Sequence, residues 1–131
     1  MANLSVFLRI FLLIGVASSI LWLSLDSDPP MPSWTFLSWD KFQHALAYAV
    51  LSLAVGGALQ HFFRSPWKTW TMAFALSLSY GVGIEFLQKY LTHNRQFEFL
   101  DILADALGAF LAAFCAYWWH RSQSLQKEED T

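Results

Sequence analysis

Residues 4–25 have the sequence LSVFLRIFLLIGVASSILWLSL, an apolar run with one charged residue, Arg9. A helix needs about 20 apolar residues to cross the roughly 30 Å hydrocarbon core of a bilayer. A secretory signal also pairs an early positive charge with an apolar stretch, but this run is long and no small-x-small cleavage site precedes Asp26. The run therefore predicts a retained transmembrane helix.

Three further segments have the same apolar character and length, at residues 42–63, 70–91 and 100–119. We expect all of them to be helices, because an unpaired backbone is too costly in lipid and the segments are too long for barrel strands. Residues 120–131 are charged, and we expect this tail to be disordered. The sequence thus predicts one all-α domain, a four-helix transmembrane bundle.

The composition agrees with a membrane protein and excludes other classes. Hydrophobic residues make up 56% of the 131 residues and charged residues 14%, whereas soluble domains have roughly 25% charged residues. The formal net charge of −2 does not suggest a nucleic-acid partner. A single cysteine, Cys115, excludes a disulfide scaffold, and its apolar neighbours predict a buried structural residue.

The tryptophans and basic residues predict how the bundle sits in the membrane. Tryptophan prefers the headgroup level. The seven tryptophans fall in two predicted belts. One contains Trp22, Trp34 and Trp39, and the other contains Trp67, Trp70, Trp118 and Trp119. The end that carries both termini has more basic residues (Arg9, Arg64, Lys68, Arg121 and Lys127) than the other end (Lys41, Lys89 and Arg95). By the positive-inside tendency, we expect both termini on the cytoplasmic side.

Unusual polar residues occur where the second span begins, the third ends and the fourth begins. Antiparallel neighbours bring these three places to one membrane face. Side chains three and four residues apart share one side of a helix. The stripes defined by this spacing are Lys41, His44 and Tyr48; Gly81, Glu85 and Gln88; and Glu98, Asp101, Asp105 and Gly108. Because small residues let helices approach closely in lipid, we expect Gly81 and Gly108 to be packing positions and the stripes to face one another around a pocket.

The residues predicted to line this pocket and bind a ligand are Asp40, Lys41, His44, Tyr48, Glu85, Gln88, Arg95, Asp101 and Asp105. Several have a structural alternative: the aspartates at the helix starts can complement the helix dipole, and the basic residues can be interfacial anchors. Glu85 and Asp105 resist that explanation, because an ionisable residue within a span is a functional-site hypothesis by default. Sequence leaves the ion pairs open: Lys41 can pair with Asp101 or Glu85.

The same residues resemble the VanZ-like family. The resemblance rests on Asp40-Lys41-x-x-His44-x-x-x-Tyr48, then Gly81-x-x-x-Glu85-x-x-Gln88, Arg95, and Asp101-x-x-Ala104-Asp105-x-x-Gly108. Where Asp105 stands, many members carry asparagine, so a titratable acid is a departure. The resemblance implies a multi-pass protein of the bacterial inner (cytoplasmic) membrane and cell envelope, related to a protein associated with reduced sensitivity to the glycopeptide antibiotic teicoplanin.

The sequence is compatible with four functions. The leading interpretation is an outward-facing pocket that binds the headgroup of a lipid or cell-wall precursor, with helix N-termini and basic residues attracting phosphate and the acids binding hydroxyls or ammonium groups. An enzyme using His44, Glu85 and Asp105 is the alternative, with a divalent metal on His44, Glu85, Asp101 and Asp105 as a variant. No zinc-histidine motif, nucleophile elbow or phosphate loop is present, so catalysis is less favoured and no cofactor is expected. A purely structural subunit and a transporter are the others, and oligomerisation stays open.

Overall fold

The computed structural model describes residues 2–26, 40–92 and 96–129, which form four helices and no strand. The helices are α1 (Ala2–Leu25), α2 (Asp40–Leu59), α3 (Pro66–Leu91) and α4 (Phe99–Glu129). All four are long and apolar enough to cross a membrane. The predicted all-α bundle of four helices is confirmed, and its architecture is that of a multi-pass membrane protein.

Three helix boundaries differ from the prediction by four residues or more. Helix α2 stops at Leu59, where the next residues bond back as turns, with Phe63 N–H donating to the Leu59 carbonyl at 3.0 Å. Helix α3 begins at Pro66, because proline has the φ angle of a first helical position and needs no N–H there. Helix α4 continues through Glu129, although we expected disorder after His120. That extension contains no glycine or proline and several strong helix formers.

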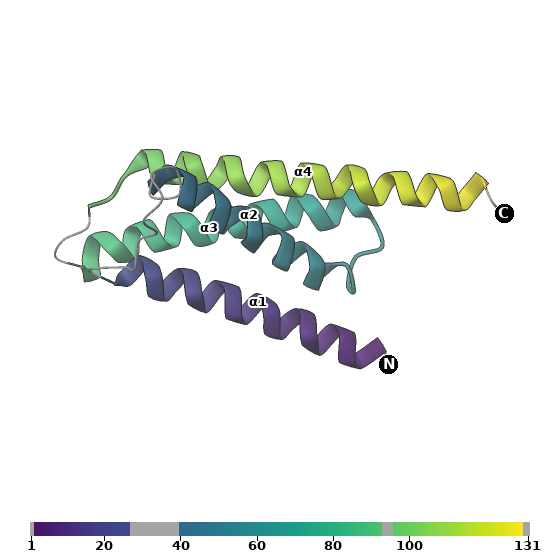
Figure 1. Cartoon of the computed structure of the whole chain (residues 1–131), viewed down its shortest axis with the longest axis horizontal. Coiled ribbons are helices and arrows are strands. Elements are labelled where there is room, and N and C mark those ends of the chain that lie inside the picture. The colour runs from purple at the N-terminus through teal and green to yellow at the C-terminus, as the bar shows by residue number, and fades with distance from the viewer. Residues whose placement is uncertain (1, 27–39, 93–95, 130–131) are drawn as a thin grey trace.

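The helices alternate in direction along the bundle. Figure 1 shows the start of α1 and the end of α4 at one end, and the starts of α2 and α4 beside the end of α3 at the other. Helices α2, α3 and α4 all contact one another, whereas α1 contacts α2 and α3 but, among the described residues, not α4. This arrangement places the three predicted polar stripes at the same end.

The core between α2, α3 and α4 combines a few large side chains with small ones. Its buried members are Tyr48, Leu51 and Val55 on α2, Trp70, Ala73 and Ile84 on α3, and Ala109 and Ala113 on α4. A Cβ atom added at Gly108 would overlap the backbone of Ala45. Helices α2 and α4 therefore approach so closely that only glycine fits at this point.

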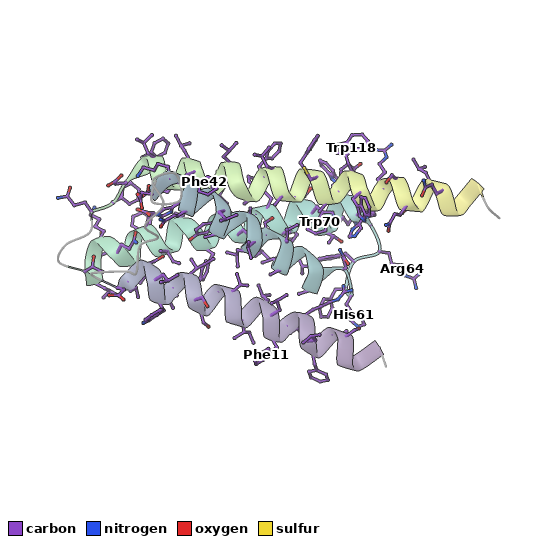
Figure 2. All side chains as sticks on the ribbon, in the orientation of Figure 1. Phe11, Phe42, His61, Arg64, Trp70 and Trp118 are labelled. Carbon is purple, nitrogen blue, oxygen red and sulfur yellow. The ribbon has the colours of Figure 1, made fainter. Side chains whose placement is uncertain are left out.

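The packing corrects one predicted placement and adds a contact at another residue. Trp70, predicted at the headgroup level, is buried in the bundle, and its indole N–H donates to His120 Nδ1 at 3.1 Å (Figure 2). The other described tryptophans are exposed, as belt residues should be. Cys115 was expected to be buried, but it is exposed on α4. Cys115 lies in a continuously apolar run, where hydrophobicity does not reveal which side of a helix faces its neighbours.

Helix α1 is held by a small number of polar contacts. Most of its large apolar side chains are exposed, and Phe11 points away from the bundle (Figure 2). The Tyr80 hydroxyl on α3 donates to the Ala17 carbonyl at 2.7 Å, and the Arg9 guanidinium donates to the Gly57 carbonyl at 2.9 Å. Since interhelical hydrogen bonds in membranes are individually modest, α1 is the least firmly attached helix.

Removing the Tyr80 hydroxyl should therefore loosen α1 measurably but not unfold the bundle. We expect Tyr80→Phe to lower the free energy of unfolding by about 1 kcal/mol, the usual range for one such bond. Unfolding by sodium dodecyl sulfate in mixed micelles measures this change. Tyr90→Phe is the matched control, because Tyr90 is 73% exposed. Equal losses in the two variants would contradict the role of the Tyr80 hydroxyl.

Candidate functional site

Polar side chains gather where α2 and α4 begin and α3 ends. Figure 2 shows oxygen and nitrogen atoms concentrated around the start of α2, near Phe42. We call this group the acidic cluster, and its described members are Asp40, Lys41, His44, Glu85, Glu98, Asp101 and Asp105. The structure thus brings together residues from three helices, at the end where the spacing predicted a pocket.

The outer part of the acidic cluster is organised by Lys41. Its ammonium group donates to Glu98 Oε2 at 2.7 Å and to Asp40 Oδ2 at 3.2 Å. It also contacts Asp101 Oδ1. Of the two partners that sequence left open for Lys41, the structure selects Asp101. The side chains of Asp40 and Glu98 are half exposed, so this outer part is open to solvent and headgroups.

The inner part pairs His44 with Asp105. The His44 Nδ1 and Asp105 Oδ1 atoms are 2.9 Å apart, and Asp105 is almost fully buried. When Asp105 is ionised, its oxygen only accepts hydrogen bonds, so the ring proton then lies on Nδ1 and the Nε2 lone pair is free in the neutral ring. That lone pair faces Asp101 Oδ2 at 3.7 Å and Asp40 Oδ1 at 4.0 Å. Asp105 therefore fixes both the orientation and the tautomer of His44.

Glu85 lies at the bottom of the acidic cluster and is only half satisfied. Its side chain is 0% exposed. Oε2 accepts the backbone N–H of Glu98 at 3.1 Å, which ties the end of α3 to the segment leading into α4. Among the described residues, Oε1 has no hydrogen-bond partner. A buried acceptor without a donor costs about 1–3 kcal/mol, so this oxygen is a candidate contact for a ligand.

Unpaired polar atoms continue from Glu85 toward the middle of the bundle. Tyr48 Oη, Ser52 Oγ and Ser77 Oγ are buried without a partner among the described residues. Gly81 lies between them and the cluster: a Cβ added there would come within 2.7 Å of Asp105 Oδ2 and 3.0 Å of the Tyr48 ring. Gly81 therefore makes room for the Asp105 carboxylate. Ser52 was not among the predicted site residues, although it follows Tyr48 by four residues on the same side of α2.

Three predicted binding residues are not members of the acidic cluster. Tyr48 is a buried member of the core. Gln88 turns toward α1, where its amide donates to the Ser24 carbonyl at 2.9 Å, so it joins α3 to α1. Arg95 lies outside the described residues. Conversely, Glu98 was predicted on the polar stripe but not as a binding residue. In the structure its side chain contacts Lys41, and its backbone N–H donates to Glu85.

The charges in the described cluster do not balance. Carboxylates come from Asp40, Glu85, Glu98, Asp101 and Asp105, whereas the basic groups are Lys41 and the His44 imidazole. Such a site attracts ammonium groups, hydroxyl donors or metal cations. The Asp105–His44 pair also has the geometry in which a carboxylate orients an imidazole for acid–base chemistry. Ligand atoms of Asp40, His44 and Asp101 lie within 4.8 Å of one another, so these three residues could hold a metal ion.

The fold and the site define a small multi-pass membrane protein with a cluster of ionisable residues at one end of its helix bundle. Comparison with models of protein families, with characterised proteins and with solved structures finds no match.

Proposed function

We propose that this chain is a VanZ-like protein of the bacterial cytoplasmic membrane whose acidic cluster binds the headgroup of an envelope lipid or of a lipid-linked cell-wall precursor. The sequence motif from Asp40 to Gly108 supports the family. The positive-inside tendency places both termini in the cytoplasm and the cluster at the outer leaflet. Altered sensitivity to teicoplanin is the cellular consequence that the family resemblance suggests.

The observation that carries the proposal is the unpaired Oε1 of Glu85. A carboxylate buried at this depth is retained only where it is paired, hydrated or used. Its free oxygen accepts a hydrogen bond from an N–H or O–H group, and the half-exposed outer part of the cluster offers the way in. The headgroup should therefore contribute an ammonium or hydroxyl donor. Phosphatidylethanolamine carries an ammonium donor, and a polyprenyl-diphosphate-linked saccharide carries hydroxyl donors.

The direct test compares headgroups that differ in donors. Purified full-length chain in phosphatidylcholine nanodiscs is titrated with phosphatidylethanolamine or with a polyprenyl-diphosphate-linked disaccharide, and bound lipid is counted by native mass spectrometry. We expect one of these lipids to bind in preference to phosphatidylcholine, whose trimethylated nitrogen has no N–H. Which of the two lipids binds shows whether the headgroup comes from a membrane lipid or from a cell-wall precursor.

Glu85→Gln should weaken that preference at least about tenfold, because hydrogen bonds to charged groups contribute about 1.5–3 kcal/mol. The substitution keeps the size of the side chain, and Glu128→Gln in the last turns of α4 is the matched control. No headgroup preference in the wild-type chain, or a Glu85→Gln variant that binds like the wild type, would refute the proposal.

A further inference from the structure

Two carboxylates of the acidic cluster each divide their oxygens between Lys41 and His44. Asp40 directs Oδ2 to the Lys41 ammonium and Oδ1 toward His44 Nε2. Asp101 does the same, with Oδ1 on Lys41 and Oδ2 toward His44 Nε2. Lys41 therefore holds both carboxylates in place without occupying the oxygens that face the imidazole.

His44 Nε2 is the third potential ligand atom, beside Asp40 Oδ1 and Asp101 Oδ2. It lies 4.0 Å from Asp40 Oδ1 and 3.7 Å from Asp101 Oδ2. Ligands about 2.1 Å from one metal ion are about 3 Å apart, so small side-chain rotations bring these three atoms onto one ion. On the opposite edge of the ring, Asp105 Oδ1 is 2.9 Å from Nδ1. Metal-binding histidines have the same carboxylate–imidazole–metal order.

The unpaired oxygen of Glu85, which also carries the headgroup proposal, suits a bound cation as well. Glu85 is fully buried, and its Oε1 has no partner among the described residues. Its other oxygen accepts the backbone N–H of Glu98, whose side chain contacts Lys41. A water molecule on a metal ion is a strong hydrogen-bond donor, and a buried carboxylate oxygen of the same cluster is a natural acceptor for it.

We propose that Asp40 Oδ1, Asp101 Oδ2 and His44 Nε2 bind a divalent metal ion, with Asp105 as the outer partner of His44. Two carboxylate oxygens and one imidazole nitrogen suit Mn²⁺, Fe²⁺ or Zn²⁺ better than a soft, thiolate-seeking ion. Three protein ligands leave coordination positions open. At these open positions the metal ion would bind a phosphate oxygen of the headgroup, although the site is otherwise acidic. Of the whole proposal, only this phosphate contact rests on the proposed function.

The test uses Mn²⁺ alone, in phosphatidylcholine nanodiscs without any other lipid. Electron paramagnetic resonance measures free Mn²⁺ during titration of the purified full-length chain, and Zn²⁺ is added as a competitor. We expect saturable binding of about one equivalent that Zn²⁺ displaces, weakened about tenfold or more in Asp40→Asn and abolished in His44→Gln. Asp40 is half exposed, so its variant should fold even where His44→Gln does not. His61→Gln, an exposed histidine at the opposite end, should bind like the wild type.

Absence of saturable Mn²⁺ binding, or equal affinities in Asp40→Asn and the wild type, would overturn the metal site. Because phosphatidylcholine is the only lipid present, this failure would leave the headgroup comparison untouched. Conversely, a chain that binds Mn²⁺ but shows no headgroup preference keeps the metal site and loses the proposed function.

Discussion

Gly108→Ala is expected to cost about 3 kcal/mol of folding free energy, at the upper end of the usual range for overpacking. The added Cβ would overlap the main-chain carbonyl of Ala45, which is part of the hydrogen-bonded ladder of α2 and cannot rotate aside as a side chain would. Helices α2 and α4 would have to separate at the level of the acidic cluster. The expected result is a lower unfolding midpoint in detergent and a weaker link between His44 and Asp105.

Gly83→Ala provides the control on α3, since a Cβ at Gly83 meets nothing within 4 Å. Alanine is the better helix former by about 1 kcal/mol, so this variant should be neutral or slightly more stable than the wild type. The contrast separates close helix packing from helix propensity, which favours alanine at both positions. Similar stabilities of the two variants would mean that α2 and α4 do not approach as closely as described.

Lys41→Met should destabilise the chain by about 2–3 kcal/mol, because it leaves three neighbouring carboxylates without their shared cation. Removing one partner of a buried ion pair costs about 3–5 kcal/mol, and the smaller figure applies here because part of the network is in contact with solvent. Methionine keeps most of the length of the stem, so lost charge and not lost packing dominates. The free energy of unfolding in mixed micelles measures the change.

Lys68→Met is the comparison for Lys41→Met, since Lys68 is exposed near the start of α3 and forms no ion pair with a described residue. It should change stability by less than about 0.5 kcal/mol, as surface substitutions usually do.

Asp101→Asn tests the same network from the acidic side. Its loss should not add to that of Lys41→Met in the double variant, because both remove the same contact. Fully additive losses would show that Lys41 and Asp101 stabilise the chain independently.

The fold and the location of the cluster could be predicted because two simple regularities determine them. Apolar run length defines the spans, and side chains three and four residues apart on antiparallel helices have to meet when each stripe turns inward. His44, Glu85, Asp101 and Asp105 come together for this reason. The pairing within the cluster could not be predicted, since Lys41 is long enough to reach several acids and only the packed helices select among them.

The contacts of single residues could not be predicted where the sequence carries no directional signal. Gln88 shares a stripe with Glu85, yet one turn of helix is enough for its amide to reach the Ser24 carbonyl on α1. Trp70 is buried because His120 offers an acceptor inside the bundle, and nothing in the apolar run around residue 70 indicates that partner. Both depend on contacts between residues far apart in the chain.

The close pairing of α2 with α4 has a consequence for biosynthesis. Ribosomes release α2 and α3 before α4, so His44 and Glu85 enter the bilayer while Asp101, Asp105 and the Glu98 amide are still absent. During that interval the nascent chain holds exposed charge in an apolar medium, which favours retention at the translocon or by a membrane chaperone until the last helix arrives. Insertion of α4 is then the step that commits the chain to its final state, and quality-control proteases should recognise any chain in which it fails.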